Sequence, residues 1–111
     1  MFLQSKIELY VPSTTDVDIP TDTQPQVNRV AIAFTEWFGG ATVSKGDGYY
    51  GCQDSHIVIE PVYIVWSYCT TQQLETYVID VEALAKEICQ ILRQESIALV
   101  INNRMYFITA S

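Results

Sequence analysis

The sequence of 111 residues predicts an α+β domain in which two amphipathic helices alternate with strands. Apolar residues recur at three- and four-residue spacing over 26–38 and over 74–94, which is the period of a helix with one buried face. Between and around these segments lie runs with the alternating or continuously apolar pattern of strands. The predicted strands are 6–11, 41–50, 56–69, 97–101 and 105–108.

The first strand and the segment after it differ sharply in composition. Ile7, Leu9 and Val11 alternate with more polar residues, which is the pattern of a half-buried strand, and Pro12 closes it. Residues 12–25 are rich in Pro, Thr and Asp and offer almost nothing to bury. We therefore expect an extended surface loop over 12–25, and the composition leaves open whether it is disordered or folds over a pocket.

The first helix has a marked end and leads into a strand with an expected irregularity. Gly39-Gly40 follows Phe38 and supplies the residue that takes a left-handed conformation after a last helical turn. In the strand 41–50, the two glycines within 45–48 predict a bulge or bend.

The later strands suggest how the sheet is arranged. Both faces of strand 56–69 are apolar or aromatic, so this strand is expected to be central and covered on both sides. The last two strands flank Asn102-Asn103, and Asn tolerates the positive φ of a tight hairpin turn. The order is thus β-α-β-β-α-β with an added C-terminal β-strand in the hairpin 97–108. This is the order of a ferredoxin-like plait, in which the first and third strands lie in the middle of the sheet.

Composition and charge narrow the classes of function. The length suits a single domain, 1–111, and 13 acidic against 6 basic residues give a net charge of −7. Such a charge disfavours nucleic acid, which is bound through clustered Lys and Arg, and no basic amphipathic stretch favours a membrane surface. Three cysteines without a Cys-x-x-Cys pair indicate neither a disulfide framework nor a common zinc motif. We expect a cytoplasmic protein with reduced thiols.

Several short signatures occur in a recognisable order along the chain. They are Glu8-Leu9-Tyr10, Phe38-Gly39-Gly40-Ala41-Thr42-Val43, Gly48-Tyr49, Glu60-Pro61 and Gln94-Glu95-Ser96. In this order they resemble a family of short bacterial proteins catalogued only as a domain of unknown function. The chain departs from that family's pattern in 12–25 and in the Asn102-Asn103 turn. The resemblance implies a ferredoxin-like fold and carries no activity with it.

The best catalytic candidates are Glu60, Glu95 and His56. Glu60 lies within an apolar strand, where a carboxylate needs a partner or a raised pKa, and Glu95 lies where the second helix meets the next strand. If both pointed into one cleft with His56, they could perform general acid/base work. The structural alternative is that Glu60 sits at a bulge before Pro61 and that Glu95 caps a loop, and residue statistics favour this alternative.

Other catalytic devices are poorly supported. His56 is the only histidine, so any nucleophile–histidine pair must use it, and the nearby Cys52 and Asp54 are neighbours in sequence only. One histidine and scattered cysteines give little for a transition metal. We therefore expect no metal and no cofactor.

Aromatic residues on the predicted strands point instead to an interface or a ligand pocket. Tyr10, Tyr63, Trp66 and Tyr68 belong to this set. In a lone plait one sheet face is covered by helices and the other meets water. The apolar second face therefore predicts a homo-oligomer, most simply a dimer.

Three functions compete on this basis. The sequence favours a small non-enzymatic module that binds a protein partner or a small molecule. The second interpretation is a cofactor-free, dimeric, ferredoxin-like enzyme acting on a small hydrophobic or aromatic molecule. A metal-dependent nuclease is the third, and the net charge of −7 opposes it.

Overall fold

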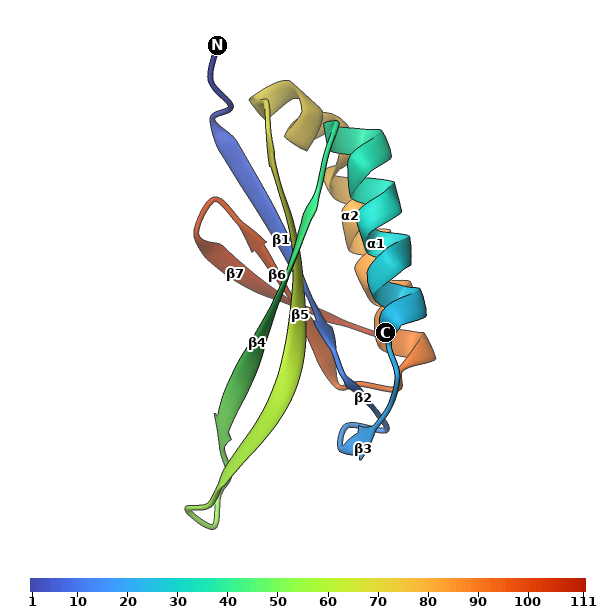
Figure 1. Cartoon of the computed structure of the whole chain (residues 1–111), viewed down its shortest axis with the longest axis vertical. Helices are drawn as coiled ribbons and strands as arrows, with labels where there is room; N and C mark the ends of the chain where they lie inside the picture. Colours follow the sequence, from blue (N-terminus) through green and yellow to red (C-terminus); the bar gives the residue numbers. More distant parts are fainter.

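The computed structural model describes all of residues 1–111 and consists of an antiparallel sheet with both helices on one face (Figure 1). The helices are α1 (Gln24–Phe38) and α2 (Thr71–Ile91). The strands of the main sheet are β1 (Ser5–Pro12), β4 (Thr42–Gly51), β5 (Ile57–Cys69), β6 (Ser96–Ile101) and β7 (Arg104–Thr109). A separate pair of two-residue strands, β2 (Thr14–Thr15) and β3 (Ile19–Pro20), lies between β1 and α1. No helix combines the length and the apolar character needed to cross a membrane.

The strand order β4-β5-β1-β6-β7 confirms the ferredoxin-like α+β fold. The first and third predicted strands, β1 and β5, are adjacent in the middle of the sheet, and β7 is the added strand at its edge. The turn between β6 and β7 is formed by Asn102 and Asn103, both at positive φ (49° and 70°), as the sequence predicts.

One face of the sheet packs on the helices and forms the core. In β1 the buried and half-buried residues alternate strictly, and Ile7, Leu9 and Val11 have no exposed surface. From α1, Val30 and Phe34 pack against them within one continuous apolar cluster. The even-numbered residues of β1 consequently point to the opposite, helix-free face.

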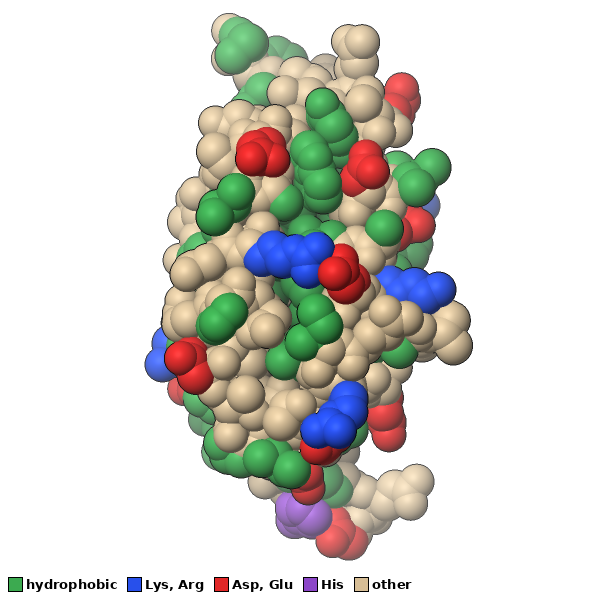
Figure 2. All heavy atoms as spheres, turned by 90° about the vertical axis from the view of Figure 1, so that its right-hand side faces the viewer, with side chains coloured by type: hydrophobic (Ala, Val, Ile, Leu, Met, Phe, Trp, Pro, Cys, Tyr) green, Lys and Arg blue, Asp and Glu red, His purple; other side chains and the backbone are tan.

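The helix boundaries follow local capping signals. α1 begins two residues before the predicted start because a proline occupies its first turn, where no backbone N–H is needed. It ends at Phe38, and the φ of 91° at the following Gly39 confirms the predicted left-handed cap. α2 begins three residues early because Thr70 and Gln73 form a reciprocal capping box. Figure 2 shows acidic and basic side chains interspersed over the outer surface of the helix layer.

The bulge predicted at 45–48 is wrong. All ten residues of β4 pair in register with β5, and Gly48 lies opposite Glu60. A Cβ on Gly48 would come within 2.5 Å of the Tyr50 hydroxyl oxygen, so this glycine makes room for the Tyr50 ring. Its role is steric, and the strand continues past it.

The prediction that strand 56–69 is covered on both faces is wrong for the helix side of its first half, while a second copy of the chain over the other face stays a prediction. The first residues of β5 and the last of β4 form a hairpin arm that extends beyond the helices, as Figure 1 shows at the lower end of the molecule. Ile57 and Ile59 are 63% and 55% exposed there. Only the second half of β5 carries buried residues on the helix face, because the helices end before the arm begins.

The segment 12–25 is an ordered structure packed against the end of α2. Thr14 is buried, and the Asp16 N–H donates a hydrogen bond to the Leu92 carbonyl (3.0 Å). The Gln94 side chain donates to the Thr14 carbonyl (3.0 Å), and Arg93 pairs with the Asp16 carboxylate. The segment thus folds back over one end of the sheet.

The packing of α1 generates a stability prediction. Phe34 is fully buried and meets Phe38 edge-to-face, with ring centroids 5.4 Å apart. Phe34→Ala should lower the free energy of unfolding by about 3–5 kcal/mol, because it leaves a cavity in the core. Ile32→Ala, on the exposed side of the same helix, should change it by less than about 0.5 kcal/mol in urea denaturation. Equal losses in both variants would show that α1 is docked through another face.

The two helices are also linked by an ion pair that predicts a pH dependence. Arg29 donates a hydrogen bond to Glu87 (2.6 Å), and this bond lowers the pKa of the Glu87 carboxyl below its ordinary value. A carboxyl with a lowered folded-state pKa stabilises the fold above its unfolded pKa, and the contribution disappears as the pH falls through the lowered value. A double-mutant cycle of Arg29→Met and Glu87→Gln should therefore show a small favourable coupling at neutral pH and none in acid. A coupling that persisted in acid would contradict the ionic origin.

Candidate functional site

A cavity of about 560 Å³ lies on the helix-free face of the sheet, between the hairpin arm, the segment 12–25 and the start of β6. It is lined by Tyr10 of β1, by Tyr50 of β4, by Val58, Glu60 and Val62 of β5, and by Ala98 and Phe107 of β6 and β7. A wider hollow of about 640 Å³ between the arm and the segment 12–25 shares Asp18, Val58 and Glu60 with it. We call the first cavity the sheet pocket.

The strand register explains why these side chains meet. The odd-numbered residues of β1 are fixed in the core, so Tyr10 must point to the helix-free face. Glu60 lies opposite Gly48 and Val58 lies opposite Tyr50, so all three side chains project from the same side of the arm. The glycine between them leaves a gap that the Tyr50 ring fills. The pocket wall is therefore a direct product of the alternation along β1, β4 and β5.

The three catalytic candidates from the sequence all line the sheet pocket. Glu60 comes from the first half of β5, Glu95 from the junction of α2 and β6, and His56 from the tip of the arm. Neither glutamate forms a hydrogen bond or an ion pair with another side chain or with the backbone. Both carboxylates are thus available to a ligand, and the bulge invoked for Glu60 does not exist.

The four aromatic candidates separate into three places. Tyr10 lines the sheet pocket. Tyr63 packs against the core on the helix side, with the Lys45 ammonium 5.7 Å from its ring centroid. Trp66 and Tyr68 lie on the helix-free face near the N-terminal end of β1, beneath the ammonium of Lys6. They form an edge-to-face pair outside the pocket.

The structure adds pocket residues that sequence reasoning missed. Burial raises the pKa of the Tyr50 hydroxyl, and the neighbouring Glu60 and Tyr10 raise it further, so Tyr50 stays protonated at neutral pH. Phe107 lies across the pocket, and Gln94 anchors its rim. The sequence signal for this arrangement is Gly48, two residues before Tyr50, but a glycine in a strand indicates a bulge or bend as readily as space for a ring.

The pocket is acidic. Asp18, Glu60 and Glu95 line it, and no lysine or arginine does. Carboxylates gathered in a concave, partly apolar site create a local negative potential that attracts cations. The aromatic walls add to this preference, because ring faces attract cations that have lost water. The site is therefore suited to a small, positively charged, partly aromatic molecule.

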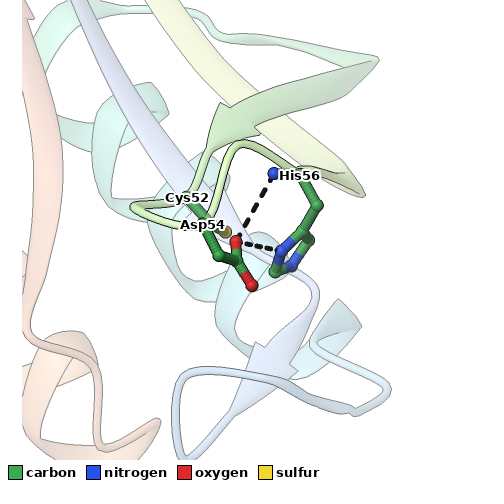
Figure 3. Close-up of side chains that lie close together, drawn as sticks. All are labelled: Cys52, Asp54 and His56. Atoms are coloured by element: carbon green, nitrogen blue, oxygen red, sulfur yellow. Dashed lines mark hydrogen bonds and ion pairs between the residues drawn. The ribbon is translucent and has the colours of Figure 1, made fainter.

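At the tip of the arm, Cys52, Asp54 and His56 converge beside the pocket (Figure 3). The His56 Nδ1 atom contacts the Asp54 carboxylate, and one ligand-capable atom from each residue lies within 4.8 Å of the other two. Their convergence could not be predicted from the sequence, because it depends on the conformation of the turn between β4 and β5. Two of the three, Cys52 and His56, also line the pocket.

The chain resembles two solved structures over nearly its whole length. One is a phage SAM lyase in complex with S-methyl-5'-thioadenosine, with a TM-score of 0.69, 21% sequence identity, and coverage of 98% of this chain and 94% of that one. The other is a phage SAM lyase in the apo state, with a TM-score of 0.70, 24% identity, and coverage of 98% and 91%. No family model matches the chain. No curated protein matches it either.

These matches establish the fold and correct one functional prediction. The sequence favoured a non-enzymatic binding module, mainly because it contains no recognisable catalytic constellation. Both of these solved structures are enzymes, which contradicts that preference. The absence of a familiar motif is weak evidence against an enzyme, because the residues of this pocket come from six segments that lie apart in the sequence.

The anchoring of the pocket rim can be tested through Gln94. Its side chain bonds the carbonyls of Thr14 and Leu92, so Gln94→Ala should free the segment 12–20 from the α2–β6 junction. We expect a loss of about 1–2 kcal/mol in stability and faster hydrogen exchange in that segment. Gln72→Ala, exposed on α2, is the matched control. Unchanged exchange in the Gln94 variant would show that other contacts hold the rim.

Proposed function

We propose that this chain is an enzyme that cleaves S-adenosylmethionine at a carbon–sulfur bond of its sulfonium centre. The observation that carries the proposal is the acidic, aromatic-lined sheet pocket without a lysine or arginine. The full-length likeness to two SAM lyase structures supports the choice of substrate. As in the second interpretation of the sequence, the substrate is a small molecule with an aromatic part. It also carries positive charge, which the sequence did not indicate.

The pocket and the proposed substrate match in charge, in aromatic character and in size. S-adenosylmethionine carries a sulfonium cation, an ammonium group and an adenine ring. Glu60 and Glu95 supply two unpaired carboxylates for the cationic groups. Tyr10, Tyr50 and Phe107 supply ring faces for stacking and for contact with the sulfonium. The cavity volume of about 560 Å³ lies within the usual range for small-molecule sites.

The bond that breaks follows from the molecule bound to one of the solved structures. S-methyl-5'-thioadenosine keeps the methyl and adenosyl groups on sulfur, so the third substituent, the aminocarboxypropyl chain, is the one that leaves. In our proposal the substrate's own carboxylate attacks the carbon bonded to sulfur. The C–O bond of a lactone forms, the C–S bond breaks, and its electron pair stays on sulfur as a neutral thioether. No proton, water or cofactor enters this balance.

This chemistry assigns a simple task to the protein. A carboxylate and a sulfonium neutralise each other in the step, so charge disappears on the way to the transition state. A pocket that excludes water therefore favours the reaction over the same step in solution. The ammonium group keeps its charge throughout, and a carboxylate such as Glu60 or Glu95 can hold it without opposing the step. The apolar and aromatic walls then surround the reacting sulfur.

The pocket is open to solvent on one side, which bears on assembly. Phe107 is 67% exposed and Tyr68 is 50% exposed on the same sheet face. We propose that further copies of the chain cover this face in a homo-oligomer and complete the exclusion of water. Three unpaired cysteines fit a reducing compartment, and we propose a cytoplasmic location on that ground.

The proposal predicts a defined product. Purified protein incubated with S-adenosylmethionine should release S-methyl-5'-thioadenosine and an equal amount of the lactone, as identified by liquid chromatography and mass spectrometry. Glu60→Gln should lower kcat/KM by about 10- to 100-fold, because it removes a charge-assisted contact to the cationic substrate. Glu75→Gln, on an exposed turn of α2 outside the pocket, is the matched control.

Two outcomes would contradict this function. Binding of S-adenosylmethionine in calorimetry without any turnover would remove the enzymatic step. Equal turnover in the wild type and in Glu60→Gln would show that the Glu60 carboxylate does not bind the cationic substrate in the sheet pocket.

A further inference from the structure

We infer that the tip of the hairpin arm is a binding site for one zinc ion, held by Cys52, Asp54 and His56. These residues occupy alternate positions in the turn that joins β4 to β5, and their side chains point toward one another (Figure 3). The inference rests on this cluster and is independent of the activity proposed for the sheet pocket.

The backbone of the turn holds the three residues in place. The Cys52 N–H donates to the His56 carbonyl (2.9 Å), and the Ser55 N–H donates to the Cys52 carbonyl (3.1 Å). Ser55 has a φ of 70°, which reverses the chain between Asp54 and His56. The turn therefore brings the thiol, the carboxylate and the imidazole to one side without help from distant parts of the fold.

The distances suit a metal with only small side-chain movements. One ligand-capable atom from each residue lies within 4.8 Å of the other two. Zinc bonds of about 2.0–2.3 Å in tetrahedral geometry place neighbouring ligand atoms roughly 3.3–3.8 Å apart. The Asp54–His56 contact has to open slightly, and the thiol has to approach slightly. The side chains of His56 and Asp54 are 60% and 70% exposed, so nothing blocks these rotations.

The choice of zinc follows from the donor set. A thiolate, an imidazole and a carboxylate together match the mixed sulfur, nitrogen and oxygen ligation of zinc, whereas calcium and magnesium prefer oxygen alone. Three protein ligands leave a fourth position for water or another group, as in zinc sites that remain open. Cys69 and Cys89 offer no alternative, because both are buried in the core.

The ordinary alternative is an ion pair that closes the turn. Asp54 and His56 would then form a local contact, and Cys52 would be near by chance. The convergence of the Cys52 thiol distinguishes the two, since a turn-closing pair has no use for a third group. Metal binding that depends on Cys52 therefore separates a zinc site from a simple Asp–His contact.

The test uses the full chain, freed of metal with a chelator and kept reduced by a phosphine. Titration with Co²⁺, a spectroscopic substitute for zinc, should give thiolate-to-cobalt charge-transfer absorption that saturates at one ion per chain, and Zn²⁺ should displace it. Cys52→Ser and His56→Ala should each weaken Zn²⁺ binding by about 10-fold or more, and Asp54→Asn should weaken it less. Gln53→Ala, in the same turn, should bind as the wild type does.

The arm lies outside the core, so circular dichroism and thermal unfolding should show these variants folded. Absence of the charge-transfer band in the wild type would overturn the inference. Equal Zn²⁺ affinity in Cys52→Ser and the wild type would also overturn it. Loss of binding in Cys52→Ser with retention in Gln53→Ala would support it.

Discussion

The one-sided attachment of both helices to the sheet is the constraint on which the rest of the structure depends. Ile7, Leu9 and Val11 are fully buried beneath the helices, so the residues between them are committed to the opposite face. A slip of one residue in β1 would bring Tyr10 into the core and remove it from the pocket. The functional surface is thus the reverse side of the folding core.

The hairpin arm keeps the same two faces where the sheet extends beyond the helices. β4 and β5 stay in register past the end of the helix layer, and the side chains of the arm therefore keep the two faces of the main sheet. Glu60 remains on the pocket face for this reason, although no core residue fixes it directly. The same continuity places the arm tip, with His56 and Cys52, at the edge of the pocket.

The sequence predicted the fold well because the fold depends on local periodicity. The helical stripes, the glycine after α1 and the Asn102-Asn103 turn each report on a few neighbouring residues, and each is found where expected. The two errors, at 45–48 and at the covering of β5, arise from non-local facts. A glycine signals a bulge or a nearby ring equally well, and apolar residues do not reveal where the helices end.

The candidate site was only partly predictable for a related reason. Each catalytic candidate has its own local signal: Glu60 is a carboxylate in an apolar strand, Glu95 lies at a helix–strand junction, and His56 is the only histidine. The fold brings all three to one pocket. Tyr50 and Phe107 carry no such local signal, because an aromatic residue in a strand is ordinary whether it lines a core, an interface or a pocket. Their grouping depends on the strand order, which no single segment contains.

The charge of the chain gains a more specific meaning from the structure. As a property of the whole chain, the net charge of −7 only disfavours binding to nucleic acid. The sheet pocket concentrates three carboxylates without a balancing cation, while the outer surface of the helices carries both signs. An acidic surface of mixed sign keeps a protein soluble, but a concave site of one sign selects its ligand. Glu60 is half-buried and Glu95 is exposed at the rim, and neither is paired with a cation of the chain, so both carboxylates remain free to meet a cationic ligand.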